Sequence, residues 1–504
     1  MTDSVSPPGE GSPGKKPPPP PSAAPPPTGE ETAREGGSAA KPSYHMSFDD
    51  FRRHGHELVD WVADYLETIE DRPITSGVKP GDIRALLPET APEQPEPFED
   101  VMQDLDEIIV GGITHWQSPG WFGFFPANSS PPSILGELVS AGLGVQGMNW
   151  ATSPAATELE TVVVDWMVDL LGLPHTWKTT GPGGGVIQMS ASDSTHLAFV
   201  IARDQADAPV ESQVVYASNQ SNSSIEKGAK IAGFEHIRLI DTDDSYALDP
   251  DALRLAAAAD LVDGLTPAAV VTNIGTTGTT AVDPLREIGR IARQYDMWHH
   301  VDAAYAGTAM ICDEFRHHQH GVELGIVDSY TMNPHKWMFT NFDCNLFYVA
   351  DRQPLLDTTN ILPPYLRDAA TESGEVINYR DWHVPLGRRF RALKLWFVLR
   401  SYGAEGIRHH VREHHRLAVE LAERVDAHPS LELIAPTPFG LVSFRHIDGD
   451  EATDTISAAI NGSGWAHVSP STIDDRRFVR VSIGQTYTTA DHVHRLWELI
   501  EASA

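Results

Sequence analysis

Apolar and polar positions change their spacing several times along the chain, and the middle of the sequence has the clearest pattern. Between about residues 131 and 350, stretches with helical spacing alternate with short apolar runs that end in turns. The runs cover 214–218, 268–275, 298–307 and 328–334, and the segment 284–296 has the spacing of a crossover helix. This alternation predicts an α/β domain with a mostly parallel sheet, in which ligands bind beyond the carboxyl ends of the strands.

The two ends of the chain show other patterns. Residues 1–43 are rich in proline and nearly free of large apolar side chains, which predicts a disordered tail. A helix capped by Ser47 is predicted over 47–70, and its apolar face needs a partner surface, either the main domain or a second subunit. A long helix, two strand-like segments and a last helix capped at Thr488 predict a small α+β domain. The predicted parts are therefore a tail (1–43), a helical segment (44–130), a large domain (131–393) and a small domain (394–504).

Composition and charge narrow the class of protein. The chain has 504 residues with 41% apolar side chains, enough for a large core, and a formal net charge of −33 that disfavours nucleic-acid binding. Two cysteines cannot form a disulfide framework and fit a reducing compartment. No apolar run approaches the ~20 residues of a membrane-spanning helix, and no secretion signal is recognisable. A cytoplasmic protein without membrane contact is predicted.

One lysine stands in an apolar segment. Lys336 lies in YTMNPHKWMFT (330–340), between His335 and Trp337. Burial disfavours the charged amine, and a neutral amine is a nucleophile that forms an imine with a carbonyl compound. The structural alternative is a lysine whose amine reaches the surface.

Two further segments agree with a carbonyl cofactor. Asp302 ends an apolar run, and a carboxylate there needs a cationic or N–H partner, such as a protonated pyridine nitrogen. A glycine-rich turn leads into Ser190, Ala191 and Ser192 at a predicted helix start, which suits a phosphate. Taken alone, each segment also fits an ordinary structural role. Together, the lysine, the aspartate and the helix start describe a site for pyridoxal 5′-phosphate (PLP).

Seven motifs extend this interpretation to most of the chain. They are THWQSP, ATSPAATELET, GGGVIQMSAS, HVDAAYAG, CDEFRHH, NPHKW and VPLGRRFRALKLWF. With them the chain resembles the group II PLP-dependent decarboxylases, and most of all the aromatic-L-amino-acid decarboxylases, from about residue 45 to 500. The resemblance implies a fold-type I enzyme and an obligate homodimer with shared active sites, packed through the 44–130 segment.

The resemblance also implies a role for each matching residue. Lys336 is implied to hold PLP as an imine, Asp302 to pair with the ring nitrogen, and His300 to support Asp302. The other cofactor-binding residues are implied to be Ala304 near the ring and Ala191, Ser192 and Asn333 at the phosphate. His335 and Tyr365, the latter on a loop that closes over the site, are implied to be catalytic. No metal is expected.

The implied reaction is decarboxylation of an aromatic L-amino acid to the arylethylamine and CO₂, with Tyr365 as the proton donor to Cα. The residues that match the family's substrate pocket are Trp116, Phe124, Phe125 and Met148. Flat apolar walls suit an aromatic ring, although Phe125 also fits an ordinary core position. Which aromatic amino acid is used stays open.

Two residues depart from the family pattern. Asn222, in SNQSNSS (218–224), stands where the family has a histidine that stacks on the cofactor ring. Asn273 stands beside the ring where threonine or serine is usual. Asparagine has no aromatic ring and no proton that titrates near neutral pH. Family members that act as aromatic acetaldehyde synthases also have asparagine at the first position.

Three interpretations therefore remain beside simple decarboxylation. The first is decarboxylation with oxidative deamination, which yields the aromatic acetaldehyde with NH₃, H₂O₂ and CO₂. The second is a catalytically inactive scaffold that binds partners through the proline-rich tail, which intact Lys336, Asp302 and His335 disfavour. The third is an aminotransferase, which the motifs do not favour.

Overall fold

The computed structural model describes residues 44–360 and 376–504, and the chain divides into two compact units, Met1–His54 and Gly55–Ala504. The predicted tail, residues 1–43, lies outside the described residues. Helix α1 (Phe48–Glu67) begins in the first unit. As predicted, Ser47 caps it, because its hydroxyl accepts the backbone N–H of Asp50 at 3.0 Å.

The second unit begins with short helices and then builds a seven-stranded sheet. Helices α2 (Asp82–Leu86), α3 (Phe98–Asp104), α4 (Pro131–Leu143) and α5 (Pro154–Leu171) precede the sheet in the sequence. The strand order is β1-β7-β6-β5-β4-β2-β3, with β7 antiparallel to both its neighbours and all pairs from β6 to β3 parallel. The strands are β1 (Gly184–Gln188), β2 (Gln213–Ser218), β3 (His236–Ile240), β4 (Thr266–Asn273), β5 (Trp298–Asp302), β6 (Ser329–Met332) and β7 (Asn345–Val349). The predicted α/β class and mostly parallel sheet are confirmed, and each of the four predicted apolar runs contains a strand.

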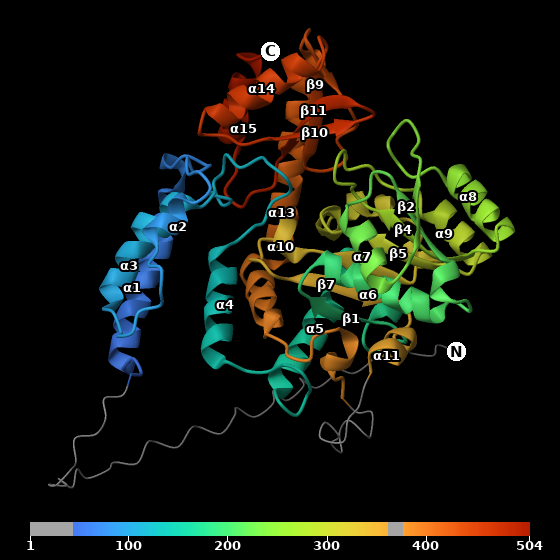
Figure 1. Cartoon of the computed structure of the whole chain (residues 1–504), viewed down its shortest axis with the longest axis horizontal. Helices are drawn as coiled ribbons and strands as arrows, with labels where there is room; N and C mark the ends of the chain where they lie inside the picture. Colours follow the sequence, from blue (N-terminus) through green and yellow to red (C-terminus); the bar gives the residue numbers. More distant parts are fainter. Residues whose placement is uncertain (1–43, 361–375) are drawn as a thin grey trace, which may run out of the picture. The chain divides into compact units, whose positions relative to one another are not determined.

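Helices cover both faces of this sheet (Figure 1). Alternate residues of β2 show the arrangement: Val215 and Ala217 pack with side chains of α6 (Ala191–Gln205) and α7 (Ser224–Ala232). Val214 and Tyr216 pack with α8 (Pro250–Val262) and α9 (Leu285–Gln294) on the other face. Helix α9 is the predicted crossover helix, and burial on both faces explains why the strands read as continuous apolar runs. Helices α10 (Pro334–Trp337) and α11 (Gln353–Thr359) follow β6 and β7.

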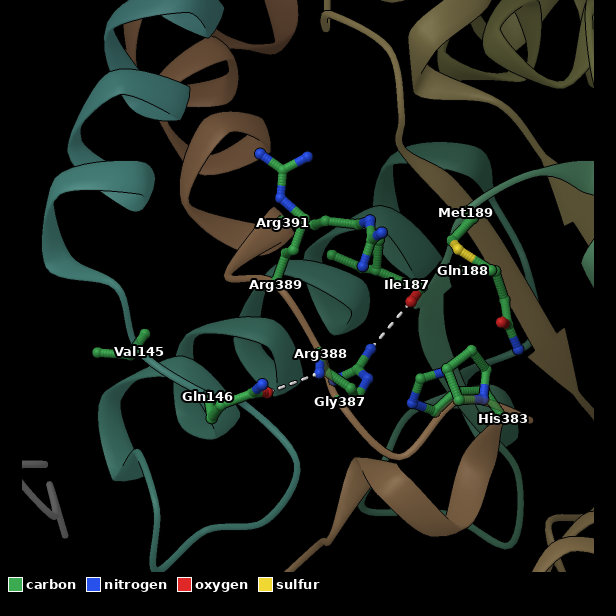
Figure 2. A pocket seen from close by; sticks show the side chains of 11 residues that line it. Val145, Gln146, Ile187, Gln188, Met189, His383, Gly387, Arg388, Arg389 and Arg391 are labelled. Atoms are coloured by element: carbon green, nitrogen blue, oxygen red, sulfur yellow. Dashed lines mark hydrogen bonds between the residues drawn. The ribbon is translucent and has the colours of Figure 1, made fainter. Parts of the chain in front are cut away.

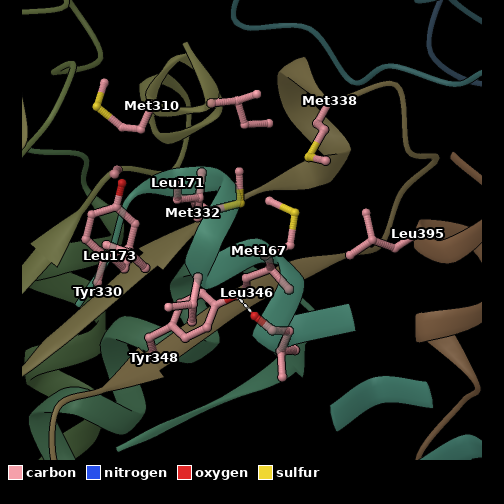
Figure 3. Packing of buried hydrophobic residues seen from close by; sticks show 14 of the residues in the cluster. Met167, Leu171, Leu173, Met310, Tyr330, Met332, Met338, Leu346, Tyr348 and Leu395 are labelled. Carbon is pink, nitrogen blue, oxygen red and sulfur yellow. Dashed lines mark hydrogen bonds between the residues drawn. The ribbon is translucent and has the colours of Figure 1, made fainter. Parts of the chain in front are cut away.

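The largest core lies between the sheet and α5, together with the start of the long helix α13 (Arg391–Ala427). Figure 3 shows its centre, where Met167 and Leu171 of α5 face Met332 and Leu346 of the sheet. The only polar group at the tip of Tyr348 is satisfied, because its hydroxyl donates to the Val164 carbonyl at 3.0 Å. Complete burial of these apolar side chains makes this region the rigid base on which the strand ends are placed.

The C-terminal part has a separate four-stranded antiparallel sheet of order β10-β11-β9-β8. Its elements are β8 (Leu431–Leu433), β9 (Leu441–His446), α14 (Asp450–Gly462), β10 (Ser469–Ile473), β11 (Arg476–Ser482) and α15 (Ala490–Glu501). This is the predicted small α+β fold, but the predicted cap of α15 was wrong by one residue. Thr489 caps the helix in a reciprocal pair with His492, while the Thr488 hydroxyl donates to the Pro119 carbonyl at 2.7 Å.

The predicted long helix is confirmed as α13, with one interruption. Gly403 has φ 64° and ψ 169°, outside the helical region, so the helix is broken at this position. Both cysteines are unpaired and buried. In the ranges that the structure describes, none of the helices has the length and apolarity needed to span a bilayer.

Candidate active site

The carboxyl ends of the central strands bring three predicted site residues together. The register of the parallel strands pairs Asn273, the last residue of β4, with Asp302, the last residue of β5. Asp302 is in turn paired with Thr331 of β6, and Asn333 follows that strand directly. This juxtaposition follows from parallel pairing, because the ends of neighbouring strands meet at one edge of the sheet.

In the described part of the chain, Asp302 has one carboxylate oxygen free to accept a hydrogen bond from a cationic partner. Its side chain is buried, and its Oδ1 accepts the backbone N–H of Ala304 at 2.9 Å. Among the described residues, its Oδ2 has no hydrogen-bond partner. Burial raises the pKa of Asp302, whereas the nearby Lys336 amine and the Ala304 N–H lower it. A protonated ring nitrogen at Oδ2 would supply the missing partner.

Lys336 comes from the short helix that follows β6. Pro334 stands at the first position of α10, where its missing N–H costs nothing, and both His335 and Trp337 are buried. Lys336 is half-buried, and its Nζ lies 5.5 Å from the centroid of the Phe125 ring. Burial lowers the pKa of Lys336, the Asp302 carboxylate raises it, and the Arg480 guanidinium lowers it further. On balance the pKa of the Lys336 amine lies below its ordinary value, which increases the fraction of neutral, nucleophilic amine.

His335 and Asn333 have defined hydrogen-bonding roles beside the lysine. The backbone N–H of Cys344 donates to His335 Nδ1 at 2.9 Å, and burial lowers the pKa of the ring to about 3. The neutral ring therefore carries its proton on Nε2. Asn345 donates from Nδ2 to Asn333 Oδ1 at 2.7 Å, which leaves the Asn333 amide N–H groups as donors for an anion.

The start of α6 offers a place for a phosphate. Ser190 caps this helix, accepting the Asp193 N–H at 3.2 Å and donating to the Asp193 carboxylate at 2.8 Å. Within the described part of the chain, the backbone N–H groups of Ala191 and Ser192 have no acceptor, as expected for a first turn. Together with Lys336 and the open oxygen of Asp302, these donors fit an aldehyde-bearing, phosphorylated pyridine such as PLP.

The aromatic residues form two groups. Phe125 stacks on Tyr305, with ring centroids 3.9 Å apart, and Tyr305 stacks on Trp337 at 4.9 Å. Phe125 packs against the largest core and also lies beside the Lys336 amine, so its position is compatible with the predicted wall of the site. Trp116 and Phe124 stack on each other at 5.6 Å, in a cluster with Trp121.

Arg480 is a functional candidate that the sequence analysis missed. It comes from β11 of the small sheet, only 5% of its surface is exposed, and its guanidinium lies 5.2 Å from the Phe125 ring centroid, like the Lys336 amine. Its Nη2 donates to the Phe124 carbonyl at 3.3 Å, and its buried Nε has no hydrogen-bond partner among the described residues. Burial lowers the pKa of Arg480 to about 10, which leaves it cationic at neutral pH. A buried cation with an unused donor fits an anionic ligand group.

The two residues that depart from the family pattern, Asn222 and Asn273, both make side-chain hydrogen bonds between the 218–224 loop and the loop after β4 or the end of β4. Asn222 is exposed, its Nδ2 donates to Thr277 Oγ1 at 3.2 Å, and its Oδ1 accepts the Ser224 N–H at 3.0 Å at the start of α7. Asn273 is buried and donates from Nδ2 to Ser221 Oγ at 2.8 Å. Both ends of the Asn222 amide are therefore used in holding the loop.

The remaining predicted residues have these positions. The ring nitrogens of His300 bond to Thr195 at 3.2 Å and Ser329 at 2.9 Å, and burial lowers its pKa to about 3, so its support of Asp302 stays a prediction. Met148 is half-buried, and its carbonyl accepts the Arg380 N–H at 2.9 Å. Tyr365 lies outside the described residues. No cluster of three or more histidine, cysteine or acidic side chains suited to a metal ion occurs in the described ranges.

A cavity of about 290 Å³ lies close to the start of α6, next to the segment that leads into α13 (Figure 2). Its lining includes Met189 and Gln188 from one side and Gly387, Arg388 and His383 from the other. Both terminal nitrogens of Arg388 donate to Glu160, at 2.8 and 2.6 Å, so the cavity has less free positive charge than its arginines suggest. Neither Lys336 nor Asp302 is among its lining residues.

A lysine just after a strand of a mostly parallel sheet, a buried aspartate at a neighbouring strand end and a helix start that suits an anion are typical of PLP-dependent enzymes. Residues 80–447 match the family described as "Pyridoxal-dependent decarboxylase conserved domain", and the chain belongs to this family. The resemblance inferred from the motifs, the fold-type I architecture and the PLP cofactor are thereby confirmed.

Similar proteins include both decarboxylases and aldehyde synthases. The chain is 42% identical to "Tyrosine decarboxylase 2" of Narcissus pseudonarcissus, over 91% of this chain and 95% of the relative. It is 43% identical to "Phenylacetaldehyde synthase" of Arabidopsis thaliana, over 93% and 98% of the two chains. The structure of Oryza sativa TDC with PLP and tryptamine matches with a TM-score of 0.89, at 37% identity over 92% and 99% of the chains. That of Rhodiola rosea 4-hydroxyphenylacetaldehyde synthase matches with a TM-score of 0.85, at 38% identity over 91% and 98%.

Proposed function

We propose that this protein decarboxylates an aromatic L-amino acid and releases CO₂ and the arylethylamine. The observation that carries this proposal is the arrangement around Phe125, where the Lys336 amine and the Arg480 guanidinium both approach the same aromatic ring. An aromatic amino acid has an amine, a carboxylate and an aromatic ring. In this proposal the amine reacts where Lys336 holds the cofactor, the carboxylate faces Arg480 and the ring lies near Phe125. Relatives that act on tyrosine and tryptophan support the same substrate class.

Each residue has a defined task in this proposal. Bound PLP supplies the electron sink that accepts the electron pair of the broken Cα–carboxylate bond. Lys336 holds the cofactor, Asp302 pairs with its ring nitrogen, and the first turn of α6 and Asn333 bind its phosphate. His335, next to Lys336, acts as a catalytic group. Arg480 orients the substrate carboxylate, the aromatic residues exclude water, and Tyr365 returns a proton to Cα.

A second product has a specific observation in its favour. With Asn222 in place of a titratable ring, protonation of Cα loses one proton donor, and oxygen can react first. The balanced reaction is amino acid, O₂ and H₂O giving aldehyde, CO₂, NH₃ and H₂O₂. The bonds of Asn222 to Thr277 and Ser224 favour the simpler role of holding the loop, so the amine remains the first proposal.

A product assay in air separates the two products. PLP-loaded protein receives phenylalanine, tyrosine, tryptophan or dopa, and amine, aldehyde, peroxide and O₂ uptake are followed together with CO₂. The proposal expects amine and CO₂ in equal amounts without peroxide. Aldehyde with equal peroxide would establish the second product, and a protein that shows no visible absorbance of bound PLP would point to the inactive scaffold.

Asn222→His tests what the asparagine does. If the amine is the product, the substitution leaves amine as the product, because Asn222 only holds the loop. If the aldehyde is the product, the new proton donor lowers the aldehyde-to-amine ratio at least ~10-fold, since a positioned acid contributes roughly 10²–10⁴ in rate. Asn219→His, which places a histidine three residues earlier in the same loop, is the matched control and leaves the ratio unchanged.

We also propose a homodimer with shared active sites. Helix α4 exposes Leu135, Leu138 and Leu143, whose side chains are 46%, 52% and 57% exposed. Burial of such apolar side chains at a subunit interface is favourable. Light scattering is expected to give twice the mass of the chain, and a monomer that decarboxylates at full rate would contradict shared sites. The cytoplasmic location stays a prediction.

A further inference from the structure

A buried carboxylate outside the predicted site, Asp283, lies at the base of the loop that follows β4. Only 2% of its surface is exposed. Its Oδ2 accepts two N–H groups of Asn273, the backbone N–H at 2.6 Å and the side-chain Nδ2 at 3.0 Å. Its Oδ1 accepts the backbone N–H of Leu248 at 2.7 Å. Burial raises the pKa of Asp283 to about 6, against the effect of these donors, so at neutral pH it is mainly the carboxylate that can accept from all three.

The Asn273 amide is fixed by this arrangement. Its Nδ2 has two hydrogens, and one is donated to Asp283 while the other goes to Ser221 Oγ at 2.8 Å. The orientation of the amide is therefore defined by its partners. Because Asn273 pairs with Asp302 across neighbouring strands, the fixed amide lies at the strand end that forms the active site.

A second connection starts from the loop 274–282. The Asp283 backbone N–H donates to the Asn273 carbonyl at 2.9 Å, and Ile274 pairs with Val282, so this loop is closed at its base. The loop carries Thr277, whose hydroxyl accepts the Asn222 Nδ2. The link through Ser221 thus ends on Asn273, which the Asp283 carboxylate holds. The link through Asn222 ends on Thr277, in the loop whose base the Asp283 backbone closes.

We infer that Asp283 is a positioning residue for the active site, which fixes the Asn273 amide and the base of the 274–282 loop and so sets the position of the 218–224 loop and of Asn222. The inference rests on the proposed function, since the resemblance places Asn222 beside the cofactor of the decarboxylation. Asp283 itself contacts none of the proposed catalytic groups. Its effect passes through Asn273, Ser221 and Thr277.

Hydrogen exchange of the backbone amides of 221–224 tests the structural half of the inference, with and without PLP. Asp283→Asn places an amide N–H₂ where one oxygen now accepts, so either the Leu248 bond or both Asn273 bonds are lost, together with the negative charge that strengthens the rest. We expect exchange in 221–224 to rise at least ~10-fold, because local opening of a loop follows the loss of its links. Ser221→Ala removes one link directly and should raise exchange in the same amides, even if Asp283→Asn fails to fold.

The matched control is Asp260→Asn. Asp260 is also a buried aspartate beside the same sheet, 4% exposed, but its partners are Tyr216 and Arg238. Its replacement should leave exchange in 221–224 unchanged. An equal rise in 221–224 for Asp283→Asn and Asp260→Asn would show general loosening of the sheet and overturn the inference.

Kinetics and spectroscopy test the functional half. For Asp283→Asn and for Ser221→Ala we expect kcat for CO₂ release to fall about tenfold with less than threefold change in KM, since a displacement far from the chemistry can cost up to ~10²-fold. The visible circular dichroism of bound PLP should change in both variants. The double variant should have a kcat no lower than that of the more impaired single variant. Unchanged kcat in both variants, or additive losses, would overturn the inference. Wild-type protein that binds PLP but releases no CO₂ would instead overturn the proposed function, while the exchange result would still decide the inference.

Discussion

Lys336→Ala is expected to abolish covalent attachment of PLP and to lower the rate of CO₂ release by at least ~10³-fold. Its amine is the proposed nucleophile, its Nζ lies 5.5 Å from the Phe125 ring centroid, and burial lowers its pKa. General acid–base work by a positioned group alone contributes roughly 10²–10⁴ in rate, and the substitution removes both this and the attachment of the cofactor. The measurement is CO₂ release together with borohydride reduction, after which the peptide containing residue 336 gains the mass of the reduced cofactor only in the wild type.

The other buried lysine provides the control for this experiment. Lys394 of α13 is completely buried, and burial lowers the pKa of its amine. Unlike Lys336, it has an ionic partner among the described residues, because its Nζ lies 3.0 Å from a Glu137 carboxylate oxygen. Lys394→Met should keep the borohydride-stable label on the peptide containing residue 336. A label that moves to another peptide, or Lys336→Ala protein that releases CO₂ near the wild-type rate, would contradict the assignment of Lys336.

The sequence was most informative where local pattern and sheet geometry act together. Apolar runs predicted β4, β5 and β6, whereas the family resemblance assigned Asn273, Asp302 and Asn333 to one site. Parallel pairing in the structure places the carboxyl ends of these strands side by side. Lys336 was recognised by its apolar neighbours and by the NPHKW motif, and the structure places it just after β6, in the short helix that starts at Pro334. The neighbourhood of β4, β5 and β6 in the sheet, which the apolar runs alone do not predict, is what brings these residues together.

Residues whose role depends on packing between distant segments could not be predicted. Asp283 reads as an ordinary acidic residue after a turn, and only the structure shows its three N–H donors. Asn345 lies in β7 with no sequence signal for its bond to Asn333. The cap of α15 was misplaced because Thr488 and Thr489 are equally good caps by residue type, and a long-range bond to Pro119 occupies the first of them.

Arg480 is the most important residue of this kind. In the sequence it is a charged residue within the strand-like segment RFVRVSIG of the small domain, far along the chain from Lys336. The only signal was its place among apolar neighbours, since a buried cation needs an anionic or carbonyl partner. Packing of β11 against the Phe125 segment brings its guanidinium to the same ring as the Lys336 amine, which no periodicity can show.

Arg480→Met should therefore have the second-largest effect, a loss of about 10²-fold in kcat/KM for CO₂ release. Methionine keeps much of the apolar volume over Phe125 but removes the only donors proposed for the substrate carboxylate. Charge-assisted hydrogen bonds to a desolvated anion are among the stronger interactions in proteins, and loss of one partner costs roughly 2–5 kcal/mol. If the guanidinium acts only on the bound substrate, KM rises with little change in kcat, whereas a role in aligning the carboxylate for bond cleavage lowers kcat as well.

Two variants define how this result is interpreted. Arg480→Lys keeps the charge but not the planar fork, and should recover only part of the loss. Arg477→Met, three residues earlier in β11, removes an arginine that is 39% exposed and paired with Asp454, and should leave kcat/KM within about twofold, because exposed ion pairs contribute little. If Arg480→Met binds PLP normally and keeps kcat/KM, the substrate carboxylate must have another partner. If it loses PLP in step with activity, the guanidinium serves the cofactor and not the amino acid.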